Sequence, residues 1–154
     1  MVSPEMLRRY PFFSFMNHVQ LHEVAMITEE LDLEAGGVLF TTRDATNGLY
    51  LLREGDVELH CTVTDERGME ERQDYLVGMI NPGEMFGISA LIRPYIYTTS
   101  ASTSSASQLL VINAGELRSL CGKDKGLEAE WQRHIAEVTL NRLNYTRIQL
   151  LAAS

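Results

Sequence analysis

The chain has 154 residues, 45% of them hydrophobic, and a formal net charge of -8. This length fits one compact domain, and the composition is ordinary for a globular protein with a core of its own. The negative charge argues against nucleic-acid binding by this chain alone, because phosphate backbones would be repelled. No apolar stretch approaches the roughly 20 residues of a membrane-spanning helix, so we expect no membrane insertion.

The cysteines and the N-terminus point to a cytoplasmic protein. Cys61 and Cys121 lie far apart and provide no disulfide framework, so we expect two buried or half-buried thiols. The first residues contain no long apolar stretch before a small-residue cleavage site, and we therefore expect no signal peptide.

Helical spacing marks the N-terminal segment, residues 1–30. Met6, Leu7 and Tyr10 recur at helical spacing before Pro11, which ends the run, and a second helical stretch follows.

Residues 31–113 change to short apolar runs separated by turn residues, and the segment 65–68 is typical of a hairpin tip. The clearest runs are 38–40, 49–52, 57–63, 75–80 and 108–112. Many short strands at regular spacing indicate an antiparallel sandwich or barrel. The Ser/Thr-rich segment 98–107 is compatible with a linker, but we predict a strand, because an apolar strand follows it at once.

Helical character returns over residues 114–154. We predict a short helix over 117–121, ended by Gly122, and a longer helix over about 126–152.

Four segments of the sequence carry a family resemblance: 11–15, 33–40, 47–59 and 81–87. In this order and with this spacing they resemble the cyclic nucleotide-binding domains of protein-kinase regulatory subunits and catabolite-activator regulators. The resemblance covers nearly the entire chain. It implies a mainly β fold: an antiparallel, jelly-roll-like β-roll (a double-stranded β-helix) with N-terminal helices and a long C-terminal helix. It also implies a loop like the family's phosphate-binding cassette over residues 83–101, and a regulatory role in signal transduction.

The cassette departs from the family pattern at two positions. In the family, a Glu accepts a hydrogen bond from the ribose and an Arg pairs with the cyclic phosphate. Gly87, Ala90 and Leu91 match the pattern, but Ile88 occupies the Glu position and Tyr97 occupies the Arg position. Loss of both groups removes several kcal/mol of interaction. We therefore expect no cofactor, and cyclic AMP binding of the usual kind is disfavoured.

A candidate ligand pocket follows from the same alignment: Phe86, Gly87, Ile88, Ser89, Ala90, Leu91, Arg93, Tyr97, Thr98 and Thr99. Arg93 could swing inward as a substitute cation, although an exposed loop arginine is the favoured interpretation. Ile88 and Tyr97 either line a drier pocket for a less charged ligand or plug the pocket altogether. The sequence leaves both alternatives open.

Neither catalysis nor metal binding is indicated. His60 and Cys61 are neighbours on a predicted strand and point to opposite faces, so they cannot share a metal without distortion. His18 and His22 lie on one helix face without an accompanying ligand motif. The sequence shows no nucleophile elbow and no phosphate loop, so we expect no enzyme and no metal site.

The C-terminal helix is a candidate dimer contact. Trp131, Val138 and Tyr145 recur every seven residues, and in regulators of this family the equivalent helix pairs with its twin. We predict a homodimer through Trp131, Ile135, Val138, Tyr145 and Ile148, with packing against the β-roll alone as the alternative.

Three functional hypotheses remain at this point. The leading one is a non-enzymatic sensor domain with a small-molecule ligand. The alternatives are an assembly module with a plugged pocket, and a fragment of a transcription regulator without its DNA-binding domain, since the sequence stops at Ser154.

Overall fold

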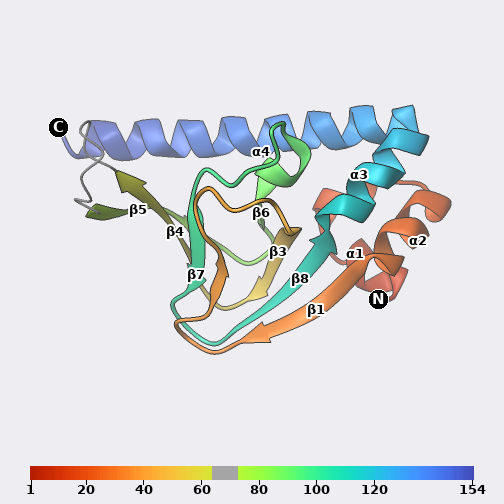
Figure 1. Ribbon diagram of the computed structural model, residues 1–154, viewed down its shortest axis with the longest axis horizontal. Helices are drawn as coiled ribbons and strands as arrows, with labels where there is room; N and C mark the ends of the chain where they lie inside the picture. The colour runs from red at the N-terminus through yellow and green to blue at the C-terminus, as the bar shows by residue number, and fades with distance from the viewer. Residues whose placement is uncertain (64–72) are drawn as a thin grey trace.

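The computed structural model describes residues 1–63 and 73–154 and shows two antiparallel sheets folded into a roll, with the N-terminal helices at one end and the long C-terminal helix running across the roll (Figure 1). The helices are α1 (Pro4–Arg8), η1 (Pro11–Phe15), α2 (His18–Met26), η2 (Ile88–Leu91), α3 (Ala114–Lys123) and α4 (Lys125–Ala152). The strands are β1 (Thr28–Leu33), β2 (Val38–Phe40), β3 (Gly48–Glu54), β4 (Val57–Val63), β5 (Gln73–Ile80), β6 (Met85–Phe86), β7 (Ser100–Thr103) and β8 (Ser107–Asn113). The hairpin tip predicted at 65–68 lies outside the described residues.

The predicted mainly β architecture is confirmed. One sheet has the strand order β1-β8-β3-β6 and the other β2-β7-β4-β5. Within the described residues, none of the helices combines the length and apolar character of a membrane span.

Strand β3 lies between two separate cores. Leu49 and Leu51 point toward the N-terminal helices, α3 and α4, whereas Tyr50 and Leu52 point into the roll. Because side chains alternate along a strand, this one segment is apolar at every position and buried on both faces.

The N-terminal helical segment ends earlier than the predicted boundary at residue 30. The Thr28 hydroxyl donates to the carbonyl oxygen of Val24 at 2.7 Å, and Thr28 then pairs with Ile112 as the first residue of β1. The alternating burial of β1 is weak, because only Thr28 is fully buried, and this is why no strand is evident there from the residue pattern.

Two short capping groups fix the C-terminal helices. The Asn113 side chain accepts from the N–H of Glu116 at 2.9 Å, so α3 starts one turn before the predicted helix over 117–121 and continues through Gly122. The Asp124 carboxylate accepts from the N–H of Leu127 at 3.1 Å and starts α4.

The Ser/Thr-rich segment is only partly a strand. Ser100–Thr103 forms β7, and residues 104–106 form the turn into β8. Ser107, the first residue of β8, accepts from the N–H of Asp56 at 3.2 Å and stabilises this corner.

Aromatic packing ties α4 to the N-terminal segment. Trp131 is completely buried, and its ring lies 5.5 Å from that of Phe12 and 5.4 Å from that of Phe15. Ile135, one turn later, is also buried. From this anchor α4 continues across the roll toward β4 and β5 (Figure 1).

We expect Trp131→Ala to lower the free energy of unfolding by about 3–5 kcal/mol, because it removes the largest side chain of this core. Urea denaturation measures the change. Leu140→Ala, at a side chain that is 54% exposed on the same helix, should cost less than about 0.5 kcal/mol. A loss below about 1 kcal/mol for Trp131→Ala would contradict the anchoring role.

Candidate ligand-binding cavity

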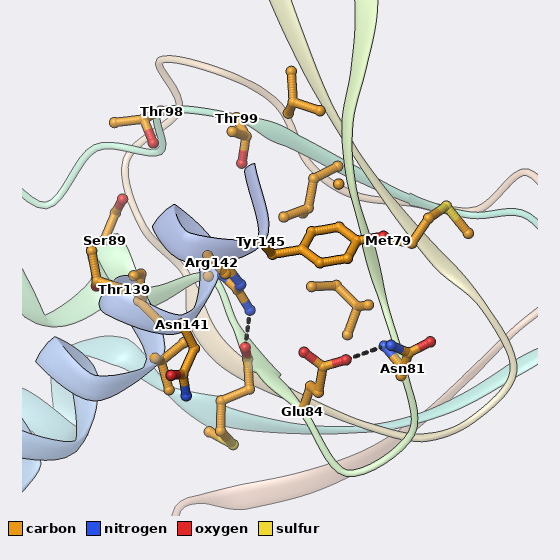
Figure 2. Close-up of a pocket in the computed structure, with 18 of the residues that line it drawn as sticks. Met79, Asn81, Glu84, Ser89, Thr98, Thr99, Thr139, Asn141, Arg142 and Tyr145 are labelled. Atoms are coloured by element: carbon orange, nitrogen blue, oxygen red, sulfur yellow. Dashed lines mark hydrogen bonds between the residues drawn. The ribbon is translucent and has the colours of Figure 1, made fainter. Parts of the chain in front are cut away.

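A cavity of about 600 Å³ lies between the roll and α4 (Figure 2). This volume falls within the range of small-molecule sites. The main wall segments are 77–81, 83–85, 87–89 and 97–99 from the roll, and residues between 138 and 146 of α4. The cassette and the C-terminal helix therefore form one site.

Glycine at position 87 places the cassette against the roll. Gly87 has φ +74°, and a Cβ atom there would lie 3.2 Å from the Gly48 carbonyl oxygen. The turn directs Ile88 and Ser89 to the cavity wall.

The candidate pocket residues divide into three groups. Gly87, Ile88, Ser89, Tyr97, Thr98 and Thr99 line the cavity. Phe86, Ala90 and Leu91 are buried in the two cores and support the wall from behind. Arg93 lies on the exposed part of the loop and does not line the cavity, as the favoured interpretation expects.

Arg118 takes the supporting role in this loop. Its guanidinium donates to the Ala90 carbonyl oxygen at 2.8 Å and to the Thr46 hydroxyl at 3.1 Å. It also lies 4.4 Å from the ring centre of Tyr95, a residue with φ +60°. Arg118 therefore holds the loop and does not line the cavity.

Tyr97 directs its polar end away from the cavity. The N–H groups of Asn47 and Gly48 donate to its hydroxyl oxygen at 3.2 and 3.1 Å, and the hydroxyl lies 2.6 Å from the Gly48 carbonyl oxygen. The ring stacks on Phe40 at 3.7 Å. Burial raises the pKa of Tyr97, and the backbone hydrogen bonds partly oppose this shift. Tyr97 is thus a neutral phenol fixed to the start of β3, and the cavity stays open beside it.

Arg142 is the cation of this cavity, and the sequence analysis missed it. It projects from α4 beside Tyr145, and its guanidinium donates to the Met85 carbonyl oxygen (Figure 2). Burial lowers the pKa of Arg142, and the negative charge of Glu84 acts in the opposite direction. Among the residues that the structure describes, none places a carboxylate within 4.0 Å of this guanidinium. A sequence signal did exist, because Arg142 follows Val138 by four residues and precedes Tyr145 by three.

Of the five predicted dimer residues, Trp131 and Ile135 are not available to a second copy, which corrects their assignment. Trp131 and Ile135 are buried in the core of this chain, and Val138 and Tyr145 line the cavity. Only Ile148, 64% exposed, is free of both environments. Apolar residues recur on both sides of α4, so the seven-residue repeat alone does not identify the side that a second copy would contact, and the homodimer stays a prediction.

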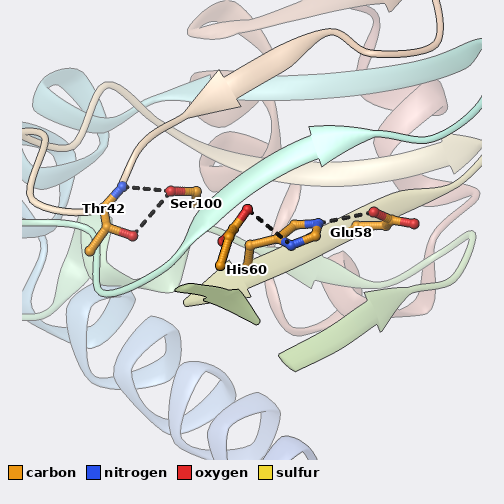
Figure 3. A network of polar contacts seen from close by, with 5 residues as sticks. Thr42, Glu58, His60 and Ser100 are labelled. Carbon is orange, nitrogen blue, oxygen red and sulfur yellow. Dashed lines mark hydrogen bonds and ion pairs between the residues drawn. The ribbon is translucent and has the colours of Figure 1, made fainter. Parts of the chain in front are cut away.

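The polar contacts of His60 lie on the outside of the roll (Figure 3). Its Nε2 atom is 2.9 Å from a Glu58 carboxylate oxygen, and its Nδ1 atom is 3.5 Å from one of Asp74. Cys61 is half-buried, with its sulfur 3.8 Å from the Thr98 carbonyl oxygen. Across residues 1–63 and 73–154, no three His, Cys, Asp or Glu side chains form a metal-binding group.

Comparison with known proteins identifies the family. The profile of the cyclic nucleotide-binding domain matches residues 30–124. A crystal structure of a provisionally named cyclic nucleotide-binding protein from Geobacter metallireducens is 34% identical and covers 93% of this chain and 99% of its own, with a TM-score of 0.80. The chain belongs to the cyclic nucleotide-binding domain family.

Two further relatives show the contexts in which such domains occur. The N-terminal domain of a transcriptional regulator from Streptomyces coelicolor is 25% identical over 94% of each chain, with a TM-score of 0.65. A provisionally named potassium channel protein of Rhodopseudomonas palustris is 23% identical over 143 residues, which are 93% of this chain. The chain spans about a third (33%) of the length of that relative.

We expect Tyr97→Phe to lower the free energy of unfolding of this domain by about 1–3 kcal/mol, because the N–H groups of Asn47 and Gly48 lose a buried acceptor. Ring stacking on Phe40 is retained, so the loss isolates the hydroxyl. Chemical denaturation of Tyr145→Phe is the matched control, since Tyr145 is 52% exposed, and should show less than about 0.5 kcal/mol. Equal losses in the two variants would contradict the assigned role.

Proposed function

We propose that this cyclic nucleotide-binding domain is a non-enzymatic regulatory sensor that binds a small molecule between the roll and α4. The observation that carries the proposal is the open cavity of about 600 Å³ whose walls include both the cassette and α4. A ligand there contacts the rigid roll and the helix together. Its binding energy is therefore available to change how α4 packs.

In our proposal, the cassette does not bind a cyclic nucleotide through a Glu to the ribose and an Arg to the phosphate. Ile88 offers no acceptor for a ribose hydroxyl, and the Tyr97 hydroxyl is already bonded to the backbone of β3. The cavity wall instead carries the hydroxyl groups of Ser89, Thr98 and Thr99. The polar contacts of a ligand thus come from neutral groups on the cassette side.

Sensing, and not catalysis, is the role that the cavity residues support. The lining residues include hydroxyls, amides, one guanidinium and one carboxylate, and they include no His or Cys. Among the described contacts, none joins a hydroxyl of this lining to the Glu84 carboxylate, so no nucleophile is paired with a base. The relatives include a protein named as a potassium channel and the N-terminal domain of a transcriptional regulator. By analogy with them, the activity that this sensor would regulate lies in another part of a longer protein.

Ligand binding can be tested by thermal shift and isothermal titration calorimetry with cyclic AMP, cyclic GMP, cyclic dinucleotides and the parent nucleosides. A ligand at 100 times its Kd should stabilise the domain by about 2.7 kcal/mol. We expect Ser89→Trp, which places an indole at the cavity wall, to abolish this stabilisation. Ser119→Trp, at an exposed position of α3, should retain it.

Two outcomes would contradict the sensor function: no stabilisation of the wild-type domain by any compound of the panel, or equal stabilisation of Ser89→Trp and wild type. The second outcome would place binding outside the cavity.

Homodimerisation is a second, compatible function, favoured by exposed leucines on α4. Leu140, Leu143 and Leu150 are 54%, 45% and 72% exposed. Their spacing places them on one stripe, on the side of α4 opposite Tyr145. Two copies of this chain could bury that stripe without disturbing the cavity.

We expect Leu143→Glu to convert the dimer to a monomer, because each copy would bury a carboxylate in the apolar seam. Light scattering coupled to size exclusion should show the mass falling to that of one 17.4 kDa chain. Gln149→Glu, on the opposite side of the helix, should leave the dimer intact. A monomeric wild-type protein at tens of micromolar would contradict the dimer.

A further inference from the structure

We infer that Arg142 of α4 is the group that pairs with the negative charge of the ligand, in place of the missing cassette arginine. The inference rests on the proposed sensor function and specifies its ligand as a nucleotide-sized organic anion. The charged contact to the ligand then comes from α4 and not from the roll. In the proposed function, α4 is the element whose packing the ligand changes.

The charges at the cavity support this assignment. Arg142 is the one cation among the lining residues, all of which the structure describes, and Glu84 is the one carboxylate. The Glu84 side chain accepts from the N–H of Asn81 at 2.8 Å, which fixes it on the roll. In a chain of net charge -8, a half-buried guanidinium without a carboxylate partner makes this the cavity's favourable place for an anion.

The hydrogen bonds of Arg142 leave capacity for a ligand. A guanidinium has five N–H donors, and the described contacts of Arg142 use one, to the Met85 carbonyl oxygen. It can therefore hold that carbonyl and an anion at the same time. The other arginines of the cassette region cannot substitute, because neither lines the cavity: Arg93 is exposed on the loop, and Arg118 lies against Ala90 and Thr46.

The position of Arg142 also provides a route from ligand to helix. Its bond to Met85 connects α4 with β6, the two-residue strand within the cassette-like segment 83–101. An anion bound to the same guanidinium adds a second connection between α4 and the roll. Ligand binding should therefore slow hydrogen exchange in residues 138–146, which line the cavity from α4.

Calorimetric titration of four proteins with charged and neutral probes tests the inference. The proteins are wild type, Arg142→Gln, Arg142→Lys and Arg147→Gln. The probes are cyclic AMP and cyclic GMP, which carry one negative charge, and the uncharged adenosine and guanosine. Arg142→Gln keeps a donor for the Met85 carbonyl but loses the charge, and Arg147→Gln changes an exposed arginine of the same helix.

We expect Arg142→Gln to weaken binding of the cyclic monophosphates at least about 30-fold, because a buried charge pair loses one partner. Arg142→Lys should retain most of the affinity, and Arg147→Gln should match wild type. Nucleoside affinity should be the same in all four proteins, a pattern that a merely structural role of Arg142 would not produce. Thermal unfolding of each variant verifies that it is folded.

The remaining outcomes overturn the inference. Equal affinity of cyclic monophosphates for wild type and Arg142→Gln, or binding of nucleosides alone, would overturn it and leave the sensor function standing. Failure of all four probes to bind wild type would overturn it as well. The sensor function is then decided separately by the cyclic dinucleotides of the wider panel.

Discussion

The indole of Trp131 is packed among phenylalanine rings of the N-terminal segment, and this packing anchors the first half of α4. A helix is stiff over several turns, so the burial of Trp131 and Ile135 also sets the course of the residues that follow. Val138, Arg142 and Tyr145 consequently lie over the open side of the roll and complete the cavity. Without this anchor the cassette would face solvent, and neither an enclosed ligand nor a charged contact from α4 would exist.

Tyr97 of the cassette is part of the packing of the roll. Its neutral phenol cannot form an ion pair with an anion, but it stacks on Phe40 and satisfies backbone groups of Asn47 and Gly48. These interactions stabilise the roll. In our proposal the positive charge is supplied by Arg142 instead, which couples the ligand directly to the helix.

The fold was readable from the sequence because its turns and strands carry local signals. Short apolar runs and turn glycines predicted the roll, whereas the altered cassette inferred from positions 88 and 97 stays a prediction. The boundaries were less accurate where local signals are weak, as at Thr28, where a helix passes directly into a strand. Caps such as Asn113 were also overlooked.

The far wall of the cavity could not be predicted, because it depends on which side of α4 faces the roll. Trp131 and Tyr145 suggested one apolar seam, and Leu140 and Leu143 form another. Only the packing of Trp131 against the N-terminal segment distinguishes the inner side from the outer one. Arg142 was missed for the same reason, since an arginine on a long helix is ordinarily expected to face solvent.

A crystal structure of the domain with cyclic AMP tests most directly whether the charge of the ligand is met from α4. The account predicts the cyclic phosphate within hydrogen-bond distance of the Arg142 guanidinium, with the Tyr97 hydroxyl still bonded to Gly48. A phosphate held by the cassette alone, with Arg142 turned away from it, would contradict the account.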